Sequence, residues 1–322
     1  MKATLACVIA GALSGLVLLG AQNRGPSEPL QETTTPYIPD VVTAGTRVQI
    51  LKRGFNGTEG PIADRDGSLL FTEQNANKII KLDTQGNFST FLENTNRTIG
   101  LGWDKKGRLI GAESAPGKVQ LGVLYPMAET LANEYQGRRI GRVNDLVIDK
   151  KGGIYFPDAV LAANEQGTPA YKPCLWYFTP DRKLIKITEE VPRPNGIILS
   201  PNGKVLYADN GAGDYLLAFD VRPDGTVGPA KNFAKLEAPP EPNARLGGDG
   251  MTVDAGGRVY TATRLGVQVV SPEGKHLGTI RIPSQTQNMA FAGPGKKTLY
   301  VVGGGNVYKI TTLTHGLPYP AK

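Results

Sequence analysis

Four residues with side-chain oxygen atoms recur at one position of a repeated pattern, and together they could bind a divalent cation. Each lies five residues before the polar residue that begins a hairpin turn, and the four are Glu59, Asn144, Asn195 and Asp249. Two carboxylates and two amide oxygens favour Ca²⁺, with Mg²⁺, Mn²⁺ or Zn²⁺ as alternatives. The lack of His and Cys ligands argues against a structural zinc site. Because two carboxylates alone would repel each other, we expect one divalent cation here.

A simpler interpretation is that these four are turn and capping residues, since Asn and Asp are common in such loops. That interpretation explains any one of the four residues, but it explains less well why four such residues share one position of the repeat. Asn202 lies in the second of two Pro-Asn-Gly tripeptides, at a different place in the repeat. It falls inside a hairpin turn, so we interpret it as an ordinary turn residue.

The elements that must position these residues are strands of a repeated hairpin. An apolar residue, a polar turn with glycine and a β-rich run recur six times, as in ADRDGSLLFTE from Ala63 and LSPNGKVLYAD from Leu199. The turn glycines at 67, 107, 152, 203, 256 and 295 are 39 to 53 residues apart. That period predicts an all-β, six-bladed β-propeller with four-stranded blades. A parallel α/β fold is disfavoured because no helical periodicity separates the strands.

Equivalent positions of a propeller lie at one radius and one height. The four polar residues each precede the innermost strand of a blade by one or two residues, so we place them on short loops at one mouth of the central channel. The run at 46–52 precedes the first copy, and we expect one early strand to pair into the last blade and close the ring. Glu73, Glu113, Asp158 and Asp209 end innermost strands and could line the far mouth, but we interpret them as solvated.

The first 21 residues read as a secretory signal peptide, with a lysine near the start, an apolar run and small residues before Ala21;. An uncleaved membrane anchor is the alternative. Residues 22–45 are rich in Pro and Thr and are interpreted as a linker, so the propeller spans 46–318. The mature protein is therefore expected to be periplasmic or secreted, free of the membrane, and a monomer or dimer.

Charge and cysteine content exclude some partners. The net charge is +7, but Lys and Arg are scattered singly with no basic run, so we expect a small-molecule partner and no nucleic acid;. Loss of the signal would remove Cys7 and leave Cys174 alone, which rules out an internal disulfide. Cys174 lies in the apolar run PCLWYF and is expected to pack as a small apolar group.

Four motifs together resemble those of the SMP-30/gluconolactonase/luciferin-regenerating enzyme family. They are EGP at 59–61, RVND at 142–145, RPNG at 193–196 and GGDGMTVD at 247–254, and the similarity extends over about 47–313. The resemblance implies a six-bladed propeller with a divalent metal in its channel. Many members of the family hydrolyse sugar lactones.

Carried over by position, the resemblance implies metal ligation by Glu59, Asn195 and Asp249. Asn144 would lie at the metal or touch the substrate, and Arg142 would contact the oxygens of the substrate. Asp249 would also donate and accept the proton. The chain departs from the family pattern after the third blade's strand, where a substrate-contacting acid of animal members falls near Ala162.

The expected activity is metal-dependent hydrolysis of a sugar lactone, as in a gluconolactonase. The alternatives are an exported ligand-binding propeller without catalysis, and a phosphotriesterase-like or strictosidine-synthase-like enzyme. A histidine-dependent hydrolase is disfavoured because the only histidines, His276 and His315, are expected to be solvated, in a hairpin turn and in the C-terminal tail;.

Overall fold

The computed structural model describes residues 30–159, 172–241 and 247–318. The expected signal peptide at 1–21 and Ala162 therefore lie outside the described residues. Residues 31–322 form one compact unit, distinct from residues 1–30. In the described part of the chain, no helix is long and apolar enough to span a membrane.

The unit is a six-bladed β-propeller, as predicted from the repeat. Blade 1 contains β3 (Thr58–Ala63), β4 (Leu69–Glu73), β5 (Lys78–Leu82) and β6 (Phe88–Glu93). Blade 2 contains β7 (Thr98–Trp103), β8 (Leu109–Ala115), β9 (Lys118–Tyr125) and β10 (Glu129–Ala132). Blade 3 contains β13 (Val147–Ile148), β14 (Ile154–Asp158), β15 (Cys174–Phe178) and β16 (Leu184–Thr188).

The second half of the ring repeats this order. Blade 4 contains β17 (Pro194–Leu199), β18 (Val205–Asn210), β19 (Tyr215–Asp220) and β20 (Lys231–Lys235). Blade 5 contains β21 (Met251–Val253), β22 (Val259–Thr263), β23 (Gly266–Val270) and β24 (His276–Ile280). Blade 6 contains β25 (Asn288–Ala292), β26 (Thr298–Gly303) and β27 (Asn306–Thr311) and is completed by β2 (Arg47–Lys52) and β1 (Thr33–Thr34).

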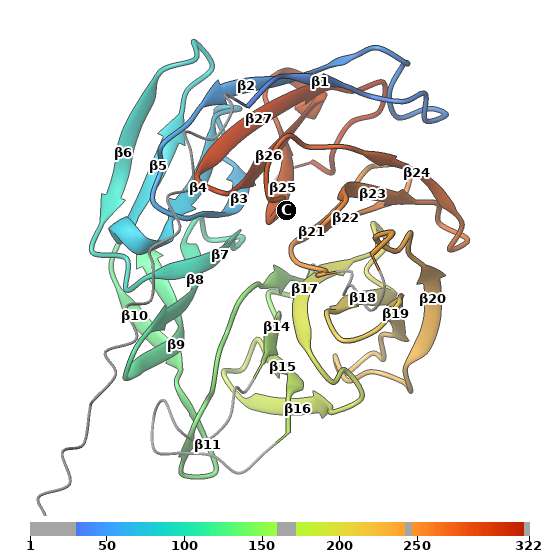
Figure 1. Ribbon diagram of the computed structural model, residues 1–322. Helices are drawn as coiled ribbons and strands as arrows, with labels where there is room; N and C mark the ends of the chain where they lie inside the picture. The colour runs from blue at the N-terminus through green and yellow to red at the C-terminus, as the bar shows by residue number, and fades with distance from the viewer. Residues whose placement is uncertain (1–29, 160–171, 242–246, 319–322) are drawn as a thin grey trace, which may run out of the picture. The chain divides into compact units, whose positions relative to one another are not determined.

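Three short features lie outside this scheme. A small hairpin of β11 (Glu134–Tyr135) and β12 (Arg138–Arg139) connects blades 2 and 3. Two 3₁₀ turns, η1 (Gln74–Ala76) and η2 (Pro294–Lys296), lie in loops of blades 1 and 6. Figure 1 shows β3, β7, β17, β21 and β25 nearest the central axis, and β6, β16, β20 and β24 on the outside.

Burial follows the distance from the axis. Every residue of β3, β7, β21 and β25 is buried, whereas the outer strand β16 is half-buried throughout. An inner strand has a neighbouring blade on both faces, so its residues read as a continuous apolar run rather than an alternating one. Cys174, in β15, is fully buried as expected, and burial raises the pKa of its thiol.

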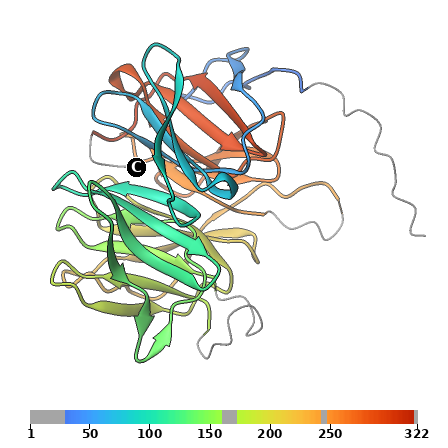
Figure 2. The same ribbon diagram turned by 90° about the vertical axis from the view of Figure 1, so that its left-hand side faces the viewer.

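Ring closure by the N-terminal strand is confirmed. β2 pairs antiparallel with β27, with Gln49 opposite Lys309 and Ile50 opposite Tyr308. In Figure 2 this blue segment lies against the red C-terminal strands. The chain just before β2, within the expected linker, also packs closely: Ile38, Val41 and Val42 are fully buried in the apolar core of blades 5 and 6.

The innermost strands approach one another so closely that some positions require glycine. A Cβ atom on Gly196 would lie 2.1 Å from the carbonyl oxygen of Asp249, and one on Gly100 would lie 2.7 Å from the Cα of Asp145. Real Cβ atoms do not approach other atoms this closely, so a larger residue would push neighbouring blades apart. The glycine after Asn195 therefore lets blade 5 bring Asp249 beside it.

Candidate functional site

Three of the four predicted ligands form a hydrogen-bonded row. The amide nitrogen of Asn144 donates to Oδ1 of Asn195 at 2.9 Å, and the amide nitrogen of Asn195 donates to Oδ1 of Asp249 at 2.8 Å. These side chains come from blades 3, 4 and 5, which are far apart in sequence. The propeller therefore brings them together at one mouth of the channel, as the repeat position predicted.

Glu59 lies in blade 1 and its side chain is buried. It accepts hydrogen bonds from Gln287 at 3.1 Å and from Asn288 at 3.3 Å, both in or next to blade 6. Burial raises the pKa of Asp249 most, and the negative charge of Glu59 raises it further, so the two carboxyl groups interact electrostatically. Gln287 occupies, in the sixth repeat copy, the position that holds a candidate ligand in four other copies. There it donates a hydrogen bond to Glu59.

Irregular strand pairing sets the direction of two of these side chains, Glu59 and Asn195. Glu59 and Asn195 lie within β3 and β17 rather than on loops before them. The pairing of β3 shifts register just after Glu59, and that of β17 shifts register between Pro194 and Ile197, around Asn195. A β-bulge bends the strand and redirects a side chain. The loop position expected from the sequence is therefore correct for Asn144 and Asp249 and wrong for Glu59 and Asn195.

The electrostatics of the site favour a positive charge. The pKa of Asp249 is well above its usual value, first because the carboxyl is buried and then because the charges of Glu59, Asp209 and Asp145 oppose its ionisation. The hydrogen bond from Asn195 acts in the opposite direction. Four carboxyl groups gathered in a water-poor region can be stabilised by a cation or by a bound proton.

The donor atoms fit a hard divalent cation. The side-chain oxygen of Asn144 is buried and has no hydrogen-bond partner among the described residues, although buried polar atoms normally have one;. Oxygen donors from two carboxylates and two amides are the ligand type of Ca²⁺. No group of three or more His, Cys, Asp or Glu side chains in the described residues is arranged as a metal site. The ligand set proposed from the repeat has only two carboxylates, so it needs the amide oxygens of Asn144 and Asn195 as well.

A cavity of about 300 Å³ opens beside this row. Asn144, Asn195 and Asp249 line it, together with Arg142, which the sequence placed at the substrate. Arg193 also lines the cavity and was not predicted, although it belongs to the RPNG motif that contains Asn195. The cavity lining thus combines three candidate ligands with two arginines.

The expectation that Glu73, Glu113, Asp158 and Asp209 are solvated at the far mouth is wrong. They lie at or near the ends of second strands, which run antiparallel to the innermost strands and so finish at the same mouth as the ligands. Asp158, Asp209 and Glu113 are buried, and Glu73 is half-buried. The sequence did contain a sign that these carboxyl groups belong near the site, because an acidic residue recurs at the end of the second strand of several blades.

Two of these buried carboxylates hold the backbone of the site. Asp158 accepts the N–H groups of Gly141 at 2.9 Å and Arg142 at 2.7 Å. Asp209 accepts the N–H of Gly196, the residue after Asn195. The two hydrogen bonds to Asp158 fix the chain at Arg142;. Burial raises the pKa of Asp209 well above its usual value, and the bond from Gly196 lowers it in part.

Residues 57–304 match the family described as SMP-30/Gluconolactonase/LRE-like region. The chain belongs to this family. A gluconolactonase from Zymomonas mobilis is 24% identical over 309 residues, which cover 88% of this chain and 86% of the relative. A lactonase, drp35, from Staphylococcus aureus is 27% identical over 262 residues, 76% of each chain.

Solved structures share the fold. A gluconolactonase from Xanthomonas campestris superposes with a TM-score of 0.74 at 24% identity, covering 90% of this chain and 99% of that one. A calcium-binding protein, regucalcin, from Agrobacterium tumefaciens gives a TM-score of 0.68 at 18% identity, covering 86% and 98%. At these identities the likeness establishes the propeller and not the reaction.

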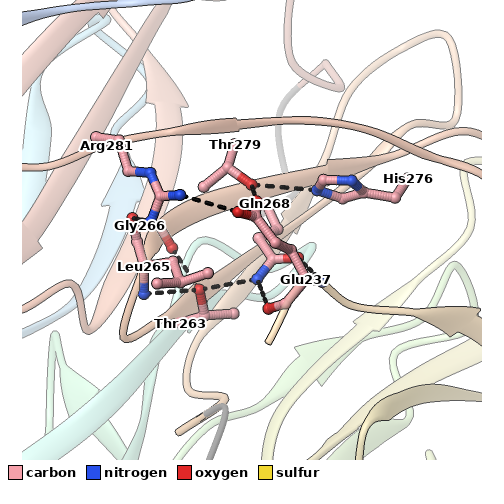
Figure 3. Close-up of polar contacts among 8 residues, drawn as sticks. All are labelled: Glu237, Thr263, Leu265, Gly266, Gln268, His276, Thr279 and Arg281. Atoms are coloured by element: carbon pink, nitrogen blue, oxygen red, sulfur yellow. Dashed lines mark hydrogen bonds and ion pairs between the residues drawn. The ribbon is translucent and has the colours of Figure 1, made fainter. Parts of the chain in front are cut away.

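The histidines of this SMP-30/gluconolactonase family member lie away from the cavity. His276 is half-buried rather than solvated: it begins β24, the outermost strand of blade 5, and its Nε2 lies 3.2 Å from the hydroxyl of Thr279. Figure 3 shows this pair joined to Glu237, which also forms an ion pair with Arg281 at 2.9 Å. The cluster ties the chain leaving blade 4 to the outer edge of blade 5. His315 is exposed, as predicted.

Proposed function

We propose that this protein is a metal-dependent hydrolase that opens a sugar lactone, with Ca²⁺ as the favoured cation. The supporting observation is that Asn144, Asn195 and Asp249 form a hydrogen-bonded row that lines a cavity together with Arg142, and that the charge of Glu59 acts on Asp249. Relatives across most of the chain are named gluconolactonase and lactonase. The cation would be held by Glu59, Asn195 and Asp249, with Asn144 at the cation or at the substrate.

The cation, when bound, would polarise the ring carbonyl of the lactone. Arg142 and Asn144 orient the substrate by donating hydrogen bonds to its oxygens, and the charge of Arg142 stabilises the negative charge that develops on the carbonyl oxygen. Asp249 accepts a proton from the attacking water, whose oxygen bonds to the carbonyl carbon. The bond from that carbon to the ring oxygen then breaks, and Asp249 returns the proton to the leaving oxygen. The product is an open-chain hydroxy acid.

The fixed geometry of the cavity suits this chemistry. Asp158 holds the backbone of Arg142, and Asp209 holds the backbone next to Asn195, so the groups that contact substrate are positioned before it binds. Preorganised donors lower a reaction barrier because they need no rearrangement during the reaction. The signal-like N-terminus further supports a proposed location outside the cytoplasm;.

A pH-indicator assay with glucono-1,5-lactone tests the proposal. Acidification above the spontaneous rate is expected for the Ca²⁺-loaded protein, with loss of the excess rate in EDTA and recovery when Ca²⁺ is restored. Asp249→Asn should abolish the excess rate while leaving the circular dichroism spectrum unchanged. Cation binding without turnover on a panel of lactones would instead identify a ligand-binding propeller and reject the enzyme.

A further inference from the structure

The two arginines of the cavity have no side-chain partner among the described residues. Arg142 and Arg193 are exposed, and neither guanidinium forms a hydrogen bond or ion pair with the described residues. Elsewhere in the described chain, Arg108 and Arg258 pair with the carboxylates of Asp104 and Asp254 at 2.7 and 3.0 Å. The arginines at the cavity are therefore available to a ligand.

Both arginines are nevertheless held in place by their backbones. The carbonyl of Arg142 accepts the N–H of Ala159 at 2.9 Å, and its own N–H binds Asp158. The carbonyl of Arg193 accepts the N–H of Gly211 at 3.0 Å. A Cβ on Gly211 would lie 3.5 Å from Cδ of Arg193, so the stem of this arginine runs across the glycine along the cavity wall.

The cavity carries charges of both signs. The carboxyl of Asp249 and the buried Asp209 behind the lining are acidic, whereas Arg142 and Arg193 contribute positive charge at exposed positions. The positive charge of Arg193 acts on Asp209, although the two form no ion pair. A ligand that complements these charges has a negatively charged group that an exposed arginine can bind.

We propose that the substrate is an anionic sugar lactone, whose phosphate or carboxylate away from the ring carbonyl is bound by Arg193. This inference rests on the proposed lactonase function and names the substrate class. A neutral lactone that displaced water from the Arg193 guanidinium would leave its charge without a counter-charge, which is unfavourable. An anion forms charge-assisted and bidentate hydrogen bonds with arginine instead. The net charge of +7 also attracts an anion;.

Binding of the ring-opened products tests the role of Arg193 without requiring turnover. Titration calorimetry of the Ca²⁺-loaded protein would compare gluconate, glucarate and 6-phosphogluconate, which share a chain and differ in their second anionic group. We expect glucarate or 6-phosphogluconate to bind about 10- to 100-fold more tightly than gluconate, the range for a charged hydrogen-bonded contact. Whichever of the two is preferred distinguishes a carboxylate from a phosphate.

The variants Arg193→Gln and Arg222→Gln provide the comparison. Arg222 lies in the hairpin between β19 and β20 of the same blade, so R222Q removes an equal charge away from the cavity. R193Q should reduce the preference to within about twofold, and R222Q should preserve it. Equal affinity for the three acids in the unmodified protein, or an undiminished preference in R193Q, would overturn the proposal. Failure of the lactone assay would reject the enzyme separately, because these titrations measure binding alone.

Discussion

At the residue scale, the two Pro-Asn-Gly tripeptides show how position in the repeat separates identical sequences. Asn202 accepts the N–H of Lys204 at 2.9 Å and the hydroxyl of Ser200 at 2.8 Å, so it stabilises a hairpin turn. Asn195 instead bridges Asn144 and Asp249 at the mouth of the channel. The same three letters therefore form a turn in one place and part of the candidate site in the other.

We predict that Asn195→Ala lowers Ca²⁺ affinity at least about tenfold, since it removes a proposed ligand and the partner of Asp249. Asn202→Asp should leave the affinity within about twofold, because aspartate also accepts hydrogen bonds in turns. Calorimetric titration with Ca²⁺ measures both variants. Equal weakening by the two substitutions would contradict the assignment of Asn195.

At the scale of elements, the segment before β2 belongs to the packed structure. β1 adds to the edge of β2, and the N–H of Leu313 donates to the carbonyl of Val41 at 2.8 Å. Ile38 lies against Gly278 of β24, where a Cβ on the glycine would be 3.0 Å from the isoleucine. Residues rich in Pro and Thr suggested a linker, but three apolar residues among them anchor the chain to blades 5 and 6.

Ile38→Ala is expected to lower the free energy of unfolding by about 2–5 kcal/mol, because it leaves a cavity in a fully buried site. The neighbouring Tyr37 is 64% exposed, so Tyr37→Ala should change stability by no more than about 0.5 kcal/mol;. Urea denaturation followed by circular dichroism measures both. Similar effects for the two variants would show that this segment does not pack as described.

At the scale of the whole molecule, the ring is closed by strands from opposite ends of the chain. β2 is hydrogen-bonded to β27, and the inner strand of blade 6 contacts that of blade 1. Glu59 receives its hydrogen bonds from Gln287 and Asn288 across this junction. Closure therefore affects the candidate site as well as stability.

A chain that starts at residue 53 should aggregate or melt at a lower temperature, because it lacks β2 and exposes β27 as an unpaired edge. A chain that starts at residue 31 retains β1 and β2 and should remain folded. Size-exclusion chromatography and thermal unfolding distinguish the two. A monomeric chain from residue 53 with unchanged melting temperature would contradict closure by β2.

Much of the fold and part of the site could be predicted from the sequence, because each blade is a local hairpin pattern. The spacing of the repeated hairpin located the blades. The position of each residue within its copy of the repeat then selected Glu59, Asn144, Asn195 and Asp249. This works because equivalent positions of a ring share radius and height, so local order determines global position.

Only the tertiary structure decided which residues support that site. Antiparallel pairing within each blade returns the end of the second strand to the mouth where the first begins, which is why Asp158 and Asp209 lie buried beside the candidate ligands. The bulges that aim Glu59 and Asn195 also depend on pairing with a neighbouring strand. Composition alone could not reveal that Ile38 is buried, since Gly278, against which it packs, is more than two hundred residues away. Such contacts depend on how the ring closes, and no local pattern contains that information.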